Sequence, residues 1–537
     1  MKKRILSAAI AFMLGGMLFA GGFTAMGERA QAAGTGAVNI NSVTIGGDSV
    51  NVNISASDLP DSDDGQYYLF AEKVYQGGPA GNPVASAPIG PSAVMSCALG
   101  YNTASNHLYD KFQVAVKQGG AFVPVTGGHY ITNPEALAGG SAGRRNGGKK
   151  GLILDGAKIG NGNTEVVSLG VQQGAYNINI ADVVGGNGAI TYNYNGKTYG
   201  FDSGYMSQYD HVVRVSSSQG MGLTMVLLNP YARGEEFLIS PHSRGGLGRC
   251  PYYMMNTSEE KGLEYLEAVV SFLAQRYNGQ NGYGQVDNWI IANEVNAKNA
   301  WNYCAVADEM AYAQLYADSV RVCYNAIKSR HANAYVCISV DQNWTKVHNP
   351  GSYYSARSMI EAVNYCIQSQ GNIDWGLAEH PYNCPMNWTP FWTPKSETMV
   401  SYVQHNQDTA YLTMENIEVL TDYMAQPQFR NTKGAVRPIL LTEVGYTSTQ
   451  GEEAQAAMIT YAYQRVMTNQ YLTMIIFNRQ TDAAAEIAQG LAVGLTRQDG
   501  SHKLAFEFYQ HLGDGGYVQR AAGIMGIADW NAAMHAR

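Results

Sequence analysis

The chain has 537 residues, 45% of them hydrophobic, and a formal net charge of −8 at pH 7. A negatively charged chain without a basic stripe repels phosphate backbones, so nucleic acid is excluded as its main partner and an uncharged substrate fits better. The length exceeds what one hydrophobic core usually serves, so we expect two domains.

The first 32 residues have the pattern of a secretory signal peptide. A basic run at residues 2–4 precedes an apolar stretch at 5–20, and the small-residue triplet Ala30, Gln31, Ala32 follows. We therefore expect cleavage near Ala32 and a secreted protein, extracellular or associated with the cell surface. No later stretch approaches the roughly 20 apolar residues that would cross a bilayer, so no membrane span is expected in the mature chain.

Residues 33–138 are predicted to form a β-sandwich-like domain. Four runs alternate apolar and polar residues, and turn clusters separate them: "AVNINSVTIGG", "SVNVNISAS", "QYYLFAEKVY" and "KFQVAVKQGG". This domain is either a glycan-binding module or a spacer, and the spacer is the preferred interpretation. The glycine-rich, polar segment 139–150 is predicted to be a linker.

Residues 151–537 are predicted to form an α/β domain of the (β/α)8 TIM barrel class. Eight apolar runs begin near residues 151, 174, 222, 286, 334, 374, 438 and 472. Helical segments separate them, such as 257–277, where Thr257 and Glu260 suggest a capping box. Residues 190–201 resemble a hairpin inserted after the second strand. An open, doubly wound sheet is the competing architecture, but no G-x-G-x-x-G or Walker-type loop follows any run.

Polar side chains follow the predicted strands where a barrel places its active site, at the carboxyl ends. Such residues end seven of the eight runs, and we expect them to converge on one rim: Asp182, Asn229, Asn293, Glu294, Asp341, Asn343, Trp344, His380, Tyr382, Glu443, Tyr446, Asn478 and Arg479. We predict that Asn229, Asp341, Trp344 and Tyr446 contact substrate there.

Two of these residues, Glu294 and Glu443, end the fourth and seventh strands. Those strands lie on opposite sides of an eight-stranded barrel, so the two carboxylates can face each other across its mouth. Carboxyl groups about 5 to 5.5 Å apart suit retaining glycoside hydrolysis, in which one attacks the anomeric carbon and the other protonates the leaving oxygen. The residues alone do not assign the two roles.

With "ANEVN" after the fourth strand and "LTEVG" at the end of the seventh, residues 150–512 resemble clan A glycoside hydrolases. The resemblance implies that Glu294 is the acid/base and Glu443 the nucleophile. It also implies that Asn293 hydrogen-bonds the sugar hydroxyl beside the reacting carbon and that Tyr382 orients Glu443. The whole chain is also similar to an uncharacterised family of secreted bacterial barrel proteins with a β-domain in front.

Strand eight departs from this family pattern. Several clan A families end it with a tryptophan below the sugar, whereas this chain has Phe477, Asn478 and Arg479. The guanidinium of Arg479 would either contact a polar or acidic sugar or form an ion pair with Glu443.

The tryptophans that follow the predicted strands allow two interpretations, sugar stacking and loop packing. Trp344, Trp388 and Trp392 follow strands five and six, where they would stack on sugar faces or anchor a long loop by packing, and Trp301 has the same ambiguity. No second histidine stands at ligand spacing from His380, so a hydrogen bond near the sugar is favoured over metal binding. No metal or cofactor is expected.

Two alternatives compete with a glycosidase. A non-catalytic carbohydrate-binding or cell-surface barrel would not need two facing carboxylates, and a serine esterase would need the G-x-S-x-G motif that the chain lacks. The seven cysteines include no C-x-x-C pair, so we expect mostly buried thiols, a count compatible with one disulfide.

Overall fold

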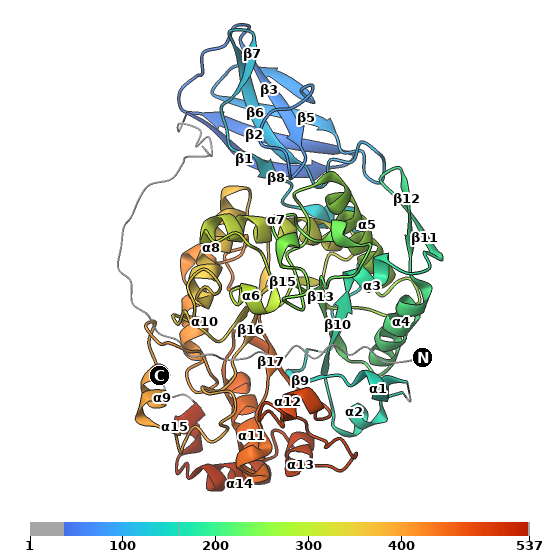
Figure 1. Ribbon diagram of the computed structural model, residues 1–537. Helices are drawn as coiled ribbons and strands as arrows, with labels where there is room; N and C mark the ends of the chain where they lie inside the picture. The colour runs from blue at the N-terminus through green and yellow to red at the C-terminus, as the bar shows by residue number, and fades with distance from the viewer. Residues whose placement is uncertain (1–36, 146, 161, 535–537) are drawn as a thin grey trace. The chain divides into compact units, whose positions relative to one another are not determined.

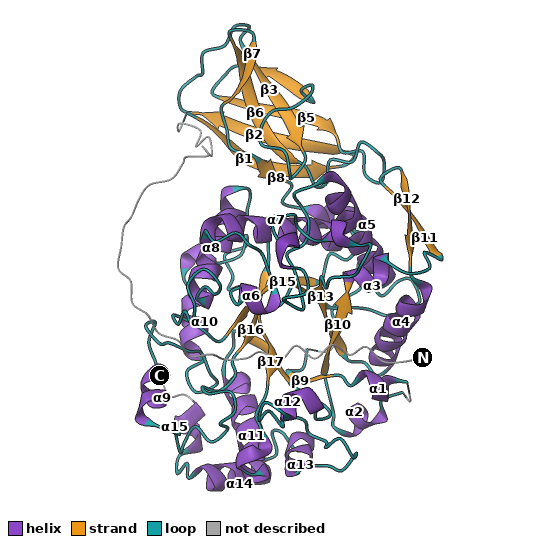
Figure 2. Ribbon diagram, viewed as in Figure 1, coloured by secondary structure: helices purple, strands orange, loops and turns teal. Residues whose placement is uncertain are grey.

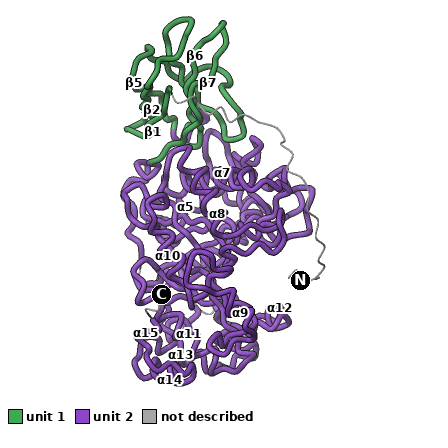
Figure 3. Tube along the Cα trace, turned by 90° about the vertical axis from the view of Figure 1, so that its left-hand side faces the viewer, with its two compact units in different colours: residues 1–100, 107–132 green, residues 101–106, 133–537 purple. Residues whose placement is uncertain are grey.

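The computed structural model describes residues 37–145, 147–160 and 162–534, which form two compact units (Figure 3). Of the described residues, the first unit contains 37–100 and 107–132, and the second contains 101–106 and those from 133 to 534. The predicted signal peptide lies outside the described residues. Within the described ranges, no helix is both long enough and apolar enough to cross a bilayer.

The first unit contains two antiparallel sheets. One has the order β1-β2-β5, and the other has the order β4-β3-β6-β7, with β8 also paired to β6. The predicted runs correspond to β1, β2, β3 and β6, whereas β4, β5, β7 and β8 were not predicted. These four strands bury few residues, and β4 and β7 bury none. The strands are β1 (Val38–Gly46), β2 (Ser49–Ala56), β3 (Gln66–Glu72), β4 (Ala85–Pro88), β5 (Ser92–Ala98), β6 (Lys111–Gln118), β7 (Ala121–Pro124) and β8 (His129–Tyr130).

The second unit is a closed barrel of eight parallel strands, as predicted (Figure 1). Each strand begins within two residues of its predicted start: β9 (Lys150–Ile153), β10 (Gln173–Asn179), β13 (Gly222–Leu228), β14 (Asn288–Ile291), β15 (Tyr335–Asp341), β16 (Gly376–His380), β17 (Ile439–Val444) and β18 (Leu472–Phe477). The predicted insertion is the hairpin of β11 (Ile190–Tyr194) and β12 (Lys197–Phe201). The (β/α)8 barrel expected from the sequence is therefore confirmed.

Side chains from six of the eight strands fill the barrel interior. The buried cluster consists of Ala175, Ile290, Cys337, Ala378, Leu440, Met474 and Ile476, and Ile153 and Val226 from the remaining two strands pack against it. Because both faces of most barrel strands are buried, these strands form apolar runs rather than alternating ones; β10, in which Asn177 is exposed, is the exception.

Helices surround the strands of the barrel unit (Figure 1). They are α1 (Gly156–Ile159), α2 (Thr164–Ser168), α3 (Ile180–Val184), α4 (Ser203–Ser218), α5 (Glu260–Arg276), α6 (Lys298–Trp301), α7 (Glu309–Lys328), α8 (Ala356–Ser369), α9 (Glu397–Tyr402), α10 (Glu418–Met424), α11 (Glu452–Thr468), α12 (Ala484–Ile487), α13 (Leu504–Gln510), α14 (Gly515–Met525) and α15 (Trp530–Met534). The capping box expected at Thr257 is wrong, because the Ser258 N–H donates to the Asn256 side chain and α5 starts only at Glu260.

The segment predicted as a linker, 139–150, falls within the barrel unit. The Arg145 N–H donates to Asp287 at 2.7 Å, and the Arg144 guanidinium lies 3.5 Å from the ring centre of Tyr335. Asp287 directly precedes β14 and Tyr335 begins β15, so the segment contacts the barrel where these strands start. The exact boundaries at 139 and 150 stay predictions.

All seven cysteines are free thiols, and five of them are buried. The expectation of mostly buried thiols is therefore confirmed, and no disulfide forms among residues 97 to 384, where the cysteines lie.

Candidate active site

A cleft of about 840 Å³ opens at the carboxyl ends of the barrel strands. Residues that end or follow β9, β10, β13, β14, β16, β17 and β18 line it, and both Glu294 and Glu443 are among them. The loops that carry the short helices α6 and α12 also contribute lining residues (Figure 2). The cleft therefore brings together two carboxylates separated by about 150 residues of sequence.

The backbone turns sharply where β14 ends. Ala292 and Glu294 both have positive φ angles, 62° and 40°, which side chains with a Cβ rarely adopt. The Glu294 N–H donates to Ser339 Oγ at 3.0 Å, and the Val295 N–H donates to the Ser339 carbonyl at 3.0 Å. Hydrogen bonds to the neighbouring strand stabilise this conformation, which costs roughly 1–3 kcal/mol per strained residue. As a result of the turn, Asn293 and Glu294 both line the cleft.

Glu294 shares a hydrogen bond with His380. The distance from Oε1 to His380 Nδ1 is 2.8 Å, and His380 Nε2 lies 3.1 Å from Thr442 Oγ1. Burial raises the pKa of Glu294 to about 7, although the His380 hydrogen bond opposes the rise. Burial opposes charging of His380, but the Glu294 hydrogen bond and nearby carboxylates raise its pKa overall. Glu294 and His380 therefore form a hydrogen-bonded pair in which both pKa values are raised.

Glu443 accepts a hydrogen bond from Tyr382, whose hydroxyl lies 2.6 Å from Oε1. The Asn478 amide donates to that hydroxyl at 3.0 Å. Burial keeps the pKa of Tyr382 well above its usual range, so the phenol stays neutral and donates. A register shift between Leu441 and Val444 interrupts the alternation of β17, and Thr442 and Glu443 both line the cleft.

Of the other predicted contacts, Asn293 and Arg479 line the cleft. The suggested ion pair between Arg479 and Glu443 is corrected by the structure. Arg479 Nη1 instead lies 3.4 Å from Oε1 of Glu486 on α12.

Asn229 and Asp341 were predicted to contact substrate, but neither lines the cleft. The Asn229 amide is buried and donates to the carbonyls of Leu238 at 3.0 Å and Tyr253 at 3.3 Å, so it shapes the loop that carries Tyr252. Asp341 accepts the Asn296 amide at 2.6 Å and thereby ties the chain after Glu294 to the end of β15. Both residues therefore stabilise loops next to the cleft, because their polar atoms form hydrogen bonds with those loops.

Four predicted aromatic contacts also lie outside the cleft lining. Trp344 and Tyr446 are buried, and the Trp344 ring packs edge-on against Tyr423 at 5.0 Å. The Trp388 indole donates to the carbonyls of Pro390 and Thr393, and Trp392 packs against Phe391. Loop anchoring by packing is therefore the reading that the contacts of these four side chains support.

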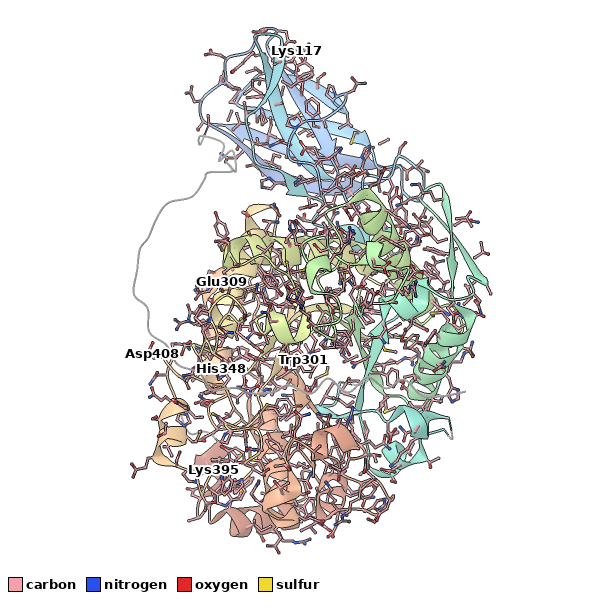
Figure 4. The ribbon with its side chains drawn as sticks, viewed as in Figure 1. Lys117, Trp301, Glu309, His348, Lys395 and Asp408 are labelled. Carbon is pink, nitrogen blue, oxygen red and sulfur yellow. The ribbon has the colours of Figure 1, made fainter. Side chains whose placement is uncertain are left out.

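Two aromatic residues, Tyr252 and Trp301, form part of the cleft lining. The sequence left the role of Trp301 open, and Tyr252 was not predicted. The rings of Tyr252 and Trp301 stack with centroids 6.3 Å apart and an interplanar angle of 27°, and both residues line the cleft. Trp301 is labelled at α6 in Figure 4. Its position seven residues after Glu294 was a usable signal, whereas Tyr252 lies in a long loop after β13 that no motif marks.

Further lining residues were not predicted as substrate contacts. They come mainly from the loops after β9, β10 and β18 and include Asp155, Tyr176, Asp182, Tyr205, Tyr209, Gln480, Asp482 and Glu486. Asp155 and Asp182 follow the first two strands directly, which was the available signal. Among the residues that the structure describes, no group of three or more His, Cys, Asp and Glu side chains is arranged to hold a metal ion.

A buried ion pair anchors the loop that carries α12. Lys503 Nζ lies 2.8 Å from Asp482, and the two side chains are 2% and 5% exposed. We expect Lys503→Met to lower the free energy of unfolding by about 3 kcal/mol, because it leaves a buried carboxylate without its cation. Chemical denaturation measures this loss. Lys395→Met, at an exposed lysine, is the control and should change stability by less than about 0.5 kcal/mol. Equal stabilities for the two variants would contradict the anchoring role.

Comparison with known proteins places these features in context. A family model described as "Family of unknown function (DUF5722)" matches residues 142–533. No curated protein matches the sequence.

Several solved structures of glycoside hydrolases are similar to the chain. A family 39 glycoside hydrolase from Bacteroides cellulosilyticus WH2 is 15% identical, with 89% of this chain and 79% of that chain covered and a TM-score of 0.45. A glucosidase from Croceicoccus marinus is 13% identical, with coverages of 70% and 69% and a TM-score of 0.44. A GH5_18 protein from Bifidobacterium longum subsp. infantis is 12% identical, with coverages of 69% and 79% and a TM-score of 0.43. These TM-scores lie below 0.5, so any functional assignment rests on the geometry of the cleft.

Proposed function

The chain belongs to the DUF5722 family of unknown function, and we propose that it is a secreted, retaining glycoside hydrolase acting on a poly- or oligosaccharide. One observation carries the proposal: Glu294, paired with His380, and Glu443, paired with Tyr382, line the same cleft at the strand ends. The signal-peptide pattern of residues 1–32 supports secretion.

The two carboxyl groups have environments suited to different roles. Burial raises the pKa of Glu294 to about 7, which suits the general acid that protonates the leaving oxygen. Glu443 attacks the anomeric carbon as the glycosidic bond breaks, and Tyr382 orients it by donating to one oxygen. Asn293 lines the same cleft, and in this proposal it hydrogen-bonds the hydroxyl beside the reacting carbon.

The second half of the reaction reverses the proton transfer. Glu294, now ionised, takes a proton from water, and that water attacks the anomeric carbon of the glycosyl ester on Glu443. The ester bond breaks, Glu443 is restored as a carboxylate, and the sugar leaves with its original anomeric configuration. The stacked rings of Tyr252 and Trp301 offer a flat surface for a sugar ring in the same cleft.

Product analysis on a panel of glycans and aryl glycosides tests the proposal. A retaining hydrolase releases new reducing ends, and proton NMR of the first product shows the anomeric configuration of the substrate. Inverted product would contradict the role of Glu443, and binding without any cleavage would favour a non-catalytic carbohydrate-binding barrel.

Activity is expected to fall as pH rises through about 7. The acid must be protonated to act, and its raised pKa keeps the proton on the Glu294–His380 pair up to that pH. His380→Gln removes the interactions that lower the pKa of Glu294, so the alkaline limb of kcat should move to higher pH while kcat itself decreases.

A pH profile of kcat for each variant measures this shift. His348→Gln is the control, since His348 does not line the cleft, and its profile should match that of the parent protein. An alkaline limb that stays in place in His380→Gln would show that His380 does not tune Glu294.

A further inference from the structure

The cleft is rich in carboxyl groups. Six acidic residues line it, namely Asp155, Asp182, Glu294, Glu443, Asp482 and Glu486. Among the described lining residues, Arg479 carries the single guanidinium and no lysine is present. A ligand that enters the cleft therefore meets a predominantly negative surface.

The one guanidinium is already paired. Arg479 Nη1 lies 3.4 Å from Glu486 Oε1, and the two side chains are 35% and 26% exposed, so both remain accessible. Asp482, the other acidic residue of this loop, is neutralised by Lys503. Asp155 accepts the Ala157 N–H at 2.9 Å and Asp182 accepts the Asn179 amide at 2.9 Å, and among the described residues no lysine or arginine forms an ion pair with either.

Backbone hydrogen bonds hold the loop that carries the Arg479–Glu486 ion pair. The Leu495 N–H donates to the Arg479 carbonyl at 3.1 Å, and the Asp482 N–H donates to the Thr496 carbonyl at 2.9 Å. The Gly494 N–H donates to Asp482 Oδ1 at 2.7 Å. These bonds connect the segment before α12 to residues 494–496. The backbone between Arg479 and Glu486 is therefore held in the conformation that brings the two side chains together.

We infer that the cleft selects neutral glycosides and rejects uronic acids, and that Glu486 is the specificity-determining residue because it occupies Arg479. The inference rests on the proposed function and names its substrate class. A uronate carboxylate would be repelled by Asp155 and Asp182, which have no paired cation, and it would have to displace Glu486 before Arg479 could bind it. A neutral sugar needs neither step, because its hydroxyls hydrogen-bond to carboxylates.

Equilibrium binding of free sugars tests this selection. Titration calorimetry compares glucose with glucuronate and galactose with galacturonate, on the full chain and on Glu486→Gln. We expect the parent protein to bind the neutral member of a pair more tightly. Glu486→Gln should tighten uronate binding by about tenfold or more, because the freed guanidinium gains a charge-assisted contact.

Two further variants make the result specific. Arg479→Gln, alone or combined with Glu486→Gln, should show no gain for uronate, since the cation is then missing. Glu507→Gln is the matched control: it breaks the exposed Arg520–Glu507 ion pair, which does not line the cleft, and should bind like the parent protein.

The inference is overturned if Glu486→Gln binds uronate no better than the parent protein, or if the parent protein binds uronate as tightly as the neutral sugar. It is also overturned if the double variant keeps the gain. Its failure is separate from that of the proposed function: a protein with the expected binding pattern that cleaves no glycoside contradicts hydrolysis and leaves the charge selection standing.

Discussion

Glu443→Gln is expected to lower kcat by at least about 10⁴-fold, which corresponds to roughly 5.5 kcal/mol of activation free energy. The amide cannot form the glycosyl ester, whereas its shape matches the carboxylate and it still accepts the hydrogen bond that Tyr382 now donates to Glu443. The variant should therefore fold normally. Steady-state rates on an aryl glycoside and a thermal melting curve measure the two effects.

Glu453→Gln provides the matched control, because Glu453 is exposed on the following helix, α11. It should retain full activity. If Glu443→Gln keeps the activity of the parent protein, the nucleophile has been misassigned, whatever its melting temperature.

Glu294→Ala is expected to lower kcat by about 10² to 10⁴-fold on substrates with poor leaving groups, because the leaving oxygen then departs unprotonated. Activated aryl glycosides need less protonation, so their first step should be affected least. Added azide should partly restore turnover on these substrates, since a small anion fits the space left by the side chain and attacks the glycosyl ester without a general base.

The product identifies the step that azide rescues. A glycosyl azide with retained configuration is expected from Glu294→Ala, and none should form in the parent protein under the same conditions. Equal loss of rate on good and poor leaving groups, together with no response to azide, would contradict the acid/base role of Glu294.

The sequence alone was enough to predict the barrel and the positions of Glu294 and Glu443 at its strand ends. Apart from Asn177 of β10, every residue of the eight strands is buried or half-buried. Most of the strands therefore appear as short apolar runs, and each run ends where the chain reaches the barrel mouth. In "WIIANE" and "ILLTE", the change from apolar to polar residues marks the point where a buried strand ends at the cleft. Counting the apolar runs along the chain was enough to assign Glu294 to the fourth strand and Glu443 to the seventh.

The partners of each side chain were decided only by the tertiary structure. His380 and Glu379 are adjacent, yet His380 reaches Glu294 in the cleft, whereas Glu379 is fully buried outside it. Burial raises the pKa of Glu379 well above its usual range, and its carboxyl oxygens have no hydrogen-bond partner among the described residues. Strand alternation sends the two residues to opposite faces.

The same reason explains the corrected contacts. Asn229 and Trp344 follow strands as the cleft residues do, but the first is used by the carbonyls of its own loop and the second packs against Tyr423. Arg479 pairs with Glu486 rather than Glu443 because a loop anchored by Lys503 presents that carboxylate. Periodicity marks where a strand ends, whereas the side chain that meets each polar group depends on loops folded from distant parts of the chain.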